Sequence, residues 1–176
     1  RWTGSEKHIY HGNDGTSMPW NDTAQLNYFH PDTRREMVAL VEHMTRICAD
    51  RYGRLDILHT NVGASIALGD APPDEITEEA LDRSFAVNFK SAWLACKHAL
   101  PHLRKNGGSI VIISSLAACT SYPWIGYKAT KTALLALTEN LATLEAKHNV
   151  RVNAILPAIT SRTASSLPLS AAGSEV

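Results

Sequence analysis

The stretch Gly108-Ser109-Ile110-Val111-Ile112-Ile113-Ser114-Ser115 decides the fold of this chain. Its unbroken run of β-branched apolar residues has the length of a single strand. Such a run is typical of a strand that is buried on both faces of a parallel sheet. The turn Asn106-Gly107-Gly108 precedes it and ends the segment before it. A central strand is therefore expected over residues 109–115.

Two further strand candidates flank this run in the sequence. Residues 55–60 form a short apolar segment that leads into the loop Asn61-Val62-Gly63-Ala64. Residues 150–156 alternate between apolar and polar side chains and stop at Pro157. These two segments supply the other predicted strands.

Apolar residues at helical spacing fill the segments before and between the strands. The first segment begins near Pro31 and stops before Gly53, as expected from the preference for proline at the start and glycine past the end of a helix. Thr77 is the expected N-cap of the second, because acidic residues fill the turn that follows it. The predicted helices run over about 32–52, from Thr77 to about Leu103, and over about 123–147.

This alternation of helices and strands determines the fold class. Strand–helix–strand units of this length are right-handed crossovers that build a parallel sheet with helices on its faces. We therefore predict one α/β domain over residues 31–160. Residues 1–30 and 161–176 show neither strand nor helix periodicity and are expected to be an irregular arm and tail.

Composition and charge exclude several classes of function. Of the 176 residues, 17 are basic and 17 are acidic, so the formal net charge is zero with histidine neutral. The chain thus lacks the basic footprint of proteins that bind nucleic acid or anionic membrane surfaces. No apolar run reaches the ~18 residues of a membrane span, and the three cysteines form neither an even disulfide set nor a Cys-x-x-Cys pair. We expect a cytoplasmic protein.

Polar, glycine or proline residues follow all three predicted strands. Asn61 and Gly63 follow the first, Ser115 ends the second, and Pro157 follows the third. In parallel sheets, ligands bind beyond the carboxyl ends of the strands. A ligand site at this edge is the first functional prediction.

Tyr127 and Lys131 are four residues apart on the third predicted helix, so their side chains share one face. A phenol titrates at about pH 10, and a neighbouring ammonium stabilises the phenolate. Such a pair can give a proton to a carbonyl oxygen or take one from an alcohol. A surface pair without a chemical role is the alternative for this motif taken alone.

Two further polar residues are candidates for the same site. Ser115 could donate a hydrogen bond to the substrate oxygen, or it could serve only as a cap or turn residue. Asn88 falls within the apolar stripe of the second predicted helix. Because a buried amide must find partners, Asn88 either braces a backbone group or holds a water in a proton relay.

Taken together, these residues resemble the short-chain dehydrogenase/reductase family. The similarity covers about residues 33–157, and it rests on the order and spacing of several motifs rather than on any one of them. The matching segments are residues 55–63, 85–90, 108–115, 127–133 and 150–157.

The resemblance implies a Rossmann-like, doubly wound sheet and NAD(P)-dependent hydride transfer between an alcohol and a carbonyl in a small-molecule substrate. It makes Tyr127 the acid/base, while Lys131 eases the ionisation of the phenol and holds the nicotinamide ribose. It also implies that Ser115 positions the substrate oxygen and that Asn88 orders the relay water. The implied cofactor-binding residues are Asn61, Gly63, Tyr127, Lys131 and Pro157.

The ends of the chain depart from the family pattern. The family's cofactor turn, Thr-Gly-x-x-x-Gly-x-Gly, is not found, since Thr3-Gly4 is followed by Gly12 and Gly15 at another spacing. The first βαβ unit and the last strand are missing or divergent, so a preference for NAD or NADP cannot be read. Two hypotheses follow: a working oxidoreductase, or a catalytically inactive fragment that acts, if at all, through subunit association.

One face of the second predicted helix bears on association. Phe89, Trp93, Lys97 and Leu100 lie away from the stripe that contains Asn88. The resemblance implies a homo-oligomer that pairs through this helix and the next. Packing of Trp93 against the loop over residues 64–75 is the alternative.

A metal site is not expected on the same helix. His98 and His102 have the i, i+4 spacing of a ligand pair, but the sequence suggests no third ligand nearby.

Overall fold

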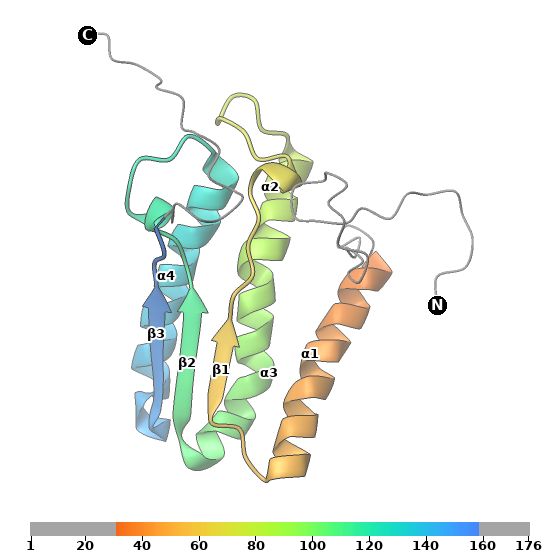
Figure 1. The fold of residues 1–176 in the computed structure, drawn as a ribbon, viewed down its shortest axis with the longest axis vertical. Coiled ribbons are helices and arrows are strands. Elements are labelled where there is room, and N and C mark those ends of the chain that lie inside the picture. The colour runs from red at the N-terminus through yellow and green to blue at the C-terminus, as the bar shows by residue number, and fades with distance from the viewer. Residues whose placement is uncertain (1–30, 159–176) are drawn as a thin grey trace.

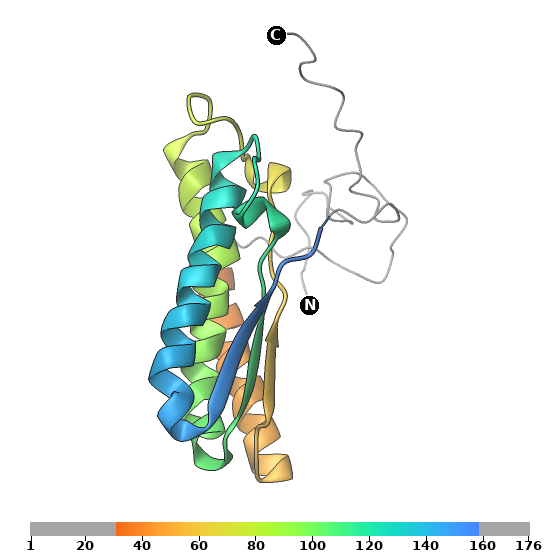
Figure 2. The same cartoon turned by 90° about the vertical axis from the view of Figure 1, so that its left-hand side faces the viewer.

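A computed structural model of the chain describes residues 31–158. The predicted arm over residues 1–30 and tail over residues 161–176 lie outside the described residues. Within the described part, a three-stranded parallel sheet carries helices along one side, as Figure 1 and Figure 2 show. The predicted α/β class with a parallel sheet is confirmed.

All three predicted strands are present. They are β1 (Ile57–Thr60), β2 (Gly108–Ile113) and β3 (Val150–Ile155), in the order β1-β2-β3. The register aligns Leu58 with Ile110 and Ile110 with Val152. The strand that decides the fold is therefore central, and the three carboxyl ends lie at one edge of the sheet.

The first and third predicted helices are also present, with shifted bounds. Helix α1 runs over Pro31–Tyr52 and packs against α3. Helix α4 runs over Ile125–Glu145 and continues as the 3-10 turn η4 (Ala146–His148). It begins two residues later than the prediction of 123, because Trp124 has an extended backbone with φ −103° and ψ 128°.

The second predicted helix is continuous but not uniform. It consists of α2 (Glu78–Ser84), the π-helical turn η2 (Phe85–Lys90) and α3 (Ser91–Asn106). Thr77 caps it as predicted, since its Oγ1 accepts a hydrogen bond from Ala80 N at 3.2 Å. The helix ends at Asn106, three residues beyond the predicted Leu103, and Gly107 follows it with a φ of +74° that favours glycine. The π turn holds Asn88, and such turns often occur at functional sites.

The core lies between the sheet and the pair α3 and α4. Leu103, Ile110, Ile112, Leu134 and Val150 are its most deeply buried large side chains. They fix the distance between the sheet and the two helices that carry Asn88, Tyr127 and Lys131.

The structure corrects the expectation that the central strand is buried on both faces. Ile110 and Ile112 are buried, whereas Val111 and Ile113 on the opposite face are only half-buried. No described helix lies over that face (Figure 2), where Ile57 and Ile155 are 65% and 51% exposed. Both faces of β2 are apolar in sequence, so the run alone could not distinguish them.

Residues 31–158 contain no helix that combines the length and the apolar character needed to cross a membrane.

Candidate active site at the carboxyl ends of the strands

Tyr127 and Lys131 come together as their spacing predicts. Both lie in the first half of α4, and Lys131 Nζ is 5.6 Å from the centroid of the Tyr127 ring. The Lys131 side chain is buried, and Nζ donates hydrogen bonds to Val62 O at 3.1 Å and to Ile113 O at 2.9 Å. Lys131 thus links α4 to the chain that follows β1 and to the last residue of β2.

Burial also changes the protonation of this amine. Removal from water disfavours the charged form and lowers the pKa of Lys131 to about 8. The amine is still mostly protonated at neutral pH, so an ammonium lies beside the Tyr127 ring. A modest rise in pH removes that charge.

Gly63 leaves room for this amine. A Cβ at Gly63 would lie 2.8 Å from Lys131 Nζ and 2.9 Å from Lys131 Cε. The residue is exposed and lacks a side chain, so it allows the amine to reach the carboxyl edge of the sheet. Its role in cofactor binding stays a prediction.

Asn88 is fully buried, and its amide braces a backbone segment. Its Oδ1 accepts from Ala64 N at 2.8 Å, and its Nδ2 donates to Ala64 O at 2.8 Å and to Thr130 Oγ1 at 3.1 Å. Asn88 therefore connects the residue after Gly63 to the residue before Lys131. These are the bonds expected of the bracing role, while the water-relay role stays a prediction.

The two serines after β2 have different partners. Ser114 is buried, and its Oγ donates to Lys131 O at 2.7 Å, which fixes α4 to the end of β2. Ser115 Oγ accepts from Ala117 N at 3.2 Å and so caps the 3-10 turn η3 (Leu116–Ala118). The cap uses the oxygen of Ser115 as an acceptor, so its O–H remains able to donate to a substrate.

Asn61 and Pro157, the other two predicted cofactor residues, follow β1 and β3. Both are exposed. Pro157 O accepts from Leu116 N at 3.0 Å, which joins the segment after β3 to η3. The two residues therefore lie at the edge that the sequence predicts for ligand binding.

Aromatic rings surround the Tyr127 side of the site. The Tyr122 ring centroid is 5.4 Å from that of Trp124 and 5.5 Å from that of Tyr127. Burial raises the pKa of Tyr122, so its hydroxyl stays neutral at physiological pH. Tyr122 therefore lies against the Tyr127 ring as a neutral aromatic side chain.

Sequence reasoning missed Asp70, which contacts the start of α4. Its buried carboxylate accepts from Gly126 N and from Tyr127 N, both at 2.7 Å. These partners lie 56 and 57 residues further along the chain, and no local motif marks the residue. The only available signal was indirect: Trp124, at the N-cap position of α4, has no side chain that can accept a hydrogen bond from the helix.

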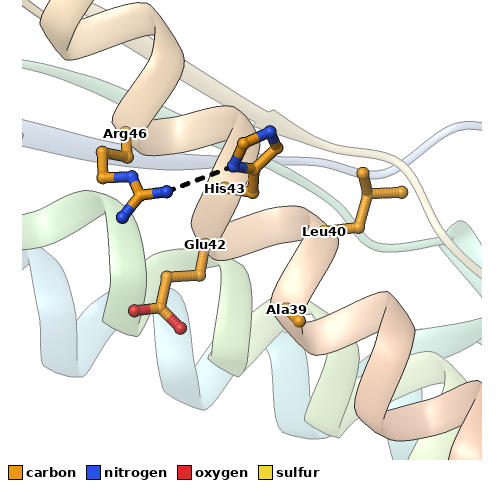
Figure 3. Close-up of a pocket in the computed structure, with 5 residues that line it drawn as sticks. All are labelled: Ala39, Leu40, Glu42, His43 and Arg46. Atoms are coloured by element: carbon orange, nitrogen blue, oxygen red, sulfur yellow. Dashed lines mark hydrogen bonds between the residues drawn. The ribbon is translucent and has the colours of Figure 1, made fainter.

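A separate hollow of about 510 Å³ lies against α1 (Figure 3). The lining residues within the described part of the chain all come from α1, and Arg46 Nη2 lies 3.4 Å from His43 Nδ1 among them. None of the candidate site residues lines it, so it is distinct from the edge where Tyr127 and Lys131 meet. Its lining residues are Ala39, Leu40, Glu42, His43 and Arg46.

Known proteins match this chain in both sequence and structure. A family model described as short chain dehydrogenase matches residues 21–172. The chain is 40% identical over 120 residues to dehydrogenase/reductase SDR family member 4 of Bos taurus, a match that covers 67% of this chain and 42% of the relative. The chain thus spans less than half of that protein.

Solved structures show the same partial coverage. A structure of ElxO with bound NADP matches with a TM-score of 0.64 and 31% identity, over 69% of this chain and 49% of that one. Acetoin dehydrogenase from Enterobacter cloacae matches with a TM-score of 0.60 and 31% identity, over 66% of this chain and 48% of that one. The fold is therefore the Rossmann-like α/β fold that these proteins share.

The family model, the matching sequences and the matching folds all point to one family. The chain belongs to the short-chain dehydrogenase/reductase family.

Proposed function

We propose that this protein is an NAD(P)-dependent oxidoreductase that transfers a hydride between an alcohol and a carbonyl, with Tyr127 as the acid/base. The observation that carries the proposal is the buried Lys131 ammonium, 5.6 Å from the Tyr127 ring centroid at the carboxyl edge of the sheet. Family membership supports the reaction class, and the NADP in the ElxO structure supports a nicotinamide cofactor.

The residues at this edge fit such a cofactor. An ammonium has three hydrogens, and Lys131 uses two of them on Val62 O and Ile113 O, which leaves one for a hydroxyl of a bound ribose. Asn61, Gly63 and Pro157 follow the strands at the same edge of the sheet, are exposed, and would supply further contacts. When bound, the nicotinamide supplies or accepts the hydride.

The chain's own residues would manage the proton and the substrate oxygen. The Tyr127 hydroxyl gives a proton to a carbonyl oxygen or takes one from an alcohol, with the Lys131 ammonium beside its ring. The Ser115 O–H donates a hydrogen bond to the same substrate oxygen. Asn88 enters as a positioning residue, because all its described bonds hold Ala64 and Thr130.

Cofactor binding is the first test. NADH and NADPH are titrated separately into the purified chain while nicotinamide fluorescence is recorded, and a panel of carbonyl compounds is then assayed for turnover. We expect saturable binding of at least one cofactor, and turnover that Tyr127→Phe abolishes while binding persists. A folded chain that binds neither cofactor at millimolar concentration would support the alternative of an inactive fragment.

We also propose that the protein is a homo-oligomer that pairs through α3 and α4. A shallow hollow of about 280 Å³ runs between these helices, and Trp93 on its rim is 39% exposed, with Lys97 Nζ 5.4 Å from its ring centroid. An exposed aromatic residue beside a groove is typical of an interface. Sedimentation should show a concentration-dependent dimer that Trp93→Glu dissociates, and a monomer at all concentrations would contradict it.

A cytoplasmic location and a small-molecule alcohol or carbonyl substrate complete the proposal. The location is supported by Cys48, Cys96 and Cys119, which are all free thiols, as expected in a reducing compartment. Cell fractionation tests the location.

A further inference from the structure

Helix α4 begins without a cap from its own sequence. The first amides of a helix have no acceptor within the helix, so they need partners from elsewhere. Ile125 N donates to Ala71 O at 3.2 Å, and Gly126 N and Tyr127 N donate to Asp70 Oδ1 and Oδ2, both at 2.7 Å. The dipeptide Asp70-Ala71 thus satisfies the first three amides of the helix that carries Tyr127.

The same carboxylate is fixed within its own loop. Asp70 Oδ1 also accepts from Ala71 N at 3.1 Å, and Oδ2 accepts from Ser65 Oγ at 2.9 Å. Each carboxylate oxygen therefore joins one amide of α4 to the loop after β1, and the negative charge lies at the positive end of the helix dipole.

The space around Gly126 is shaped to this contact. A Cβ at Gly126 would lie 2.8 Å from Asp70 Oδ1 and 2.8 Å from Ser84 Oγ. Any side chain at this position would therefore push the carboxylate away from the helix. A glycine at the second position of α4 allows the close approach that the two 2.7 Å bonds require.

We propose that Asp70 is a positioning residue for the reaction, which sets the position of Tyr127 at the start of α4, whereas Lys131 is held by its own bonds to Val62 O and Ile113 O. The inference rests on the proposed function, in which Tyr127 exchanges a proton with the substrate. It requires a carboxylate, since both oxygens must accept from an amide of α4. A neutral amide of the same shape offers one acceptor and one donor.

Asp70→Asn is the decisive substitution, because it keeps the size of the side chain but places an NH₂ group against Gly126 N or Tyr127 N. We expect amide hydrogen exchange at Gly126 and Tyr127 to become at least about tenfold faster, and the ring resonances of Tyr127 to shift. Turnover should fall between about tenfold and a hundredfold, with the KM for the cofactor within about twofold of wild type, because the acid/base is misplaced while the cofactor contacts remain. The Tyr127→Phe spectrum identifies the resonances.

Thr77→Ala is the matched control. It removes the side-chain cap of α2, where Thr77 Oγ1 accepts from Ala80 N at 3.2 Å, and it does not touch α4. Exchange at Ala80 should increase, whereas the Tyr127 resonances and turnover should not change. A Tyr127 shift in this variant would show that any loss of a cap perturbs the site, and would overturn a specific role for Asp70.

Ser65→Ala is the milder second variant, because it removes one bond to Asp70 Oδ2 and keeps both bonds to α4. It should shift the Tyr127 resonances in the same direction as Asp70→Asn, by less. If the Asp70→Asn variant does not fold, Ser65→Ala alone tests the role of Asp70. Tyr127 resonances that do not change in this variant would then overturn that role.

The failures of the two proposals are distinguishable. A wild-type chain that neither binds nicotinamide cofactors nor turns over carbonyl compounds contradicts the proposed function, while the Tyr127 resonances and amide exchange still test Asp70. A folded Asp70→Asn variant with wild-type exchange, resonances and turnover overturns the role of Asp70 and leaves the proposed function intact.

Discussion

The two ends of the α3–α4 pair are held together by different kinds of side chain. At the end where α3 leads into β2, Leu103, Ile110 and Val150 are almost completely buried. At the carboxyl edge of the strands, Asn88, Thr130 and Lys131 are buried to the same degree, but they are polar or charged. The first is called here the apolar end and the second the polar end.

The apolar end mainly supplies stability, whereas the polar end determines where the backbone and side chains of the candidate site lie. Burial of an aliphatic side chain is favourable without any particular direction. A buried polar group costs free energy unless its hydrogen bonds are made, so each one specifies where its partners must lie. Asn88 and Lys131 specify the backbone at Ala64, Val62 and Ile113 in this way.

The rim of the apolar end carries one ion pair. Arg104 Nε and Nη2 donate to Glu145 Oε2 and Oε1 at 2.7 and 2.5 Å. This bidentate pair holds the pKa of Glu145 below its usual range and joins the last turns of α3 and α4. The pair therefore holds α3 against α4 at the end opposite the candidate site.

The largest effect on stability is expected at the apolar end. Leu103→Ala removes a fully buried side chain and leaves a cavity, so the free energy of unfolding should fall by about 3 kcal/mol. Urea unfolding measures the change. Leu144→Ala, at a position that is 54% exposed, is the control and should change it by less than about 0.5 kcal/mol. Equal losses in the two variants would show that the apolar end is not the main source of stability.

At the polar end, Asn88→Leu should lower the free energy of unfolding by about 2 kcal/mol, because Ala64 N and Ala64 O lose their partner and Thr130 Oγ1 loses the bond that it accepts from Asn88. Unlike Leu103→Ala, it should also shift the Tyr127 resonances in the folded protein. The comparison between the two ends fails if Leu103→Ala perturbs Tyr127 as much as Asn88→Leu does.

Lys131 predicts how stability depends on pH. Its pKa of about 8 lies below the ordinary 10.5, so between these values the unfolded chain binds more protons and stability rises with pH. The stability of wild type relative to Lys131→Met should therefore increase by about 2 kcal/mol from pH 7 to pH 10. Urea unfolding of both proteins across this range measures it, and a constant difference would contradict the buried ammonium.

The smallest effect is expected for Gly63→Ala. The new methyl group would meet the end of the flexible Lys131 side chain, which can move away, so stability should fall by less than about 1 kcal/mol. The same substitution in a Lys131→Met background tests the cause, because the two changes should be non-additive. Additive effects would show that Gly63 acts through something other than the amine.

The sequence predicts those parts of the fold that depend on residues close to one another along the chain. The strand around Ile112, the Thr77 cap and the pairing of Tyr127 with Lys131 depend on residues within a few positions of one another. The family resemblance rests on such segments too. The π turn at Phe85–Lys90 left no signal, because its residues fit an α-helical stripe equally well.

The contacts that sequence did not predict join distant segments. Asn88 bonds to Ala64, 24 residues earlier, and Asp70 bonds to Gly126, 56 residues later. A carboxylate in a loop has many possible partners, and only the folded chain selects one. The open face of the sheet is a similar case, since the apolar pattern of β2 does not say which side is covered.

The cap that Asp70 provides also fixes when the first turn of α4 can form. The later turns of α4 have acceptors within the helix, but Gly126 and Tyr127 gain theirs only after the chain has closed a loop of 56 residues. We therefore expect the beginning of α4 and the loop over residues 65–71 to form together and to open together as one unit. Tyr127, the proposed acid/base, lies on that unit, so we expect its position to depend on these long-range contacts.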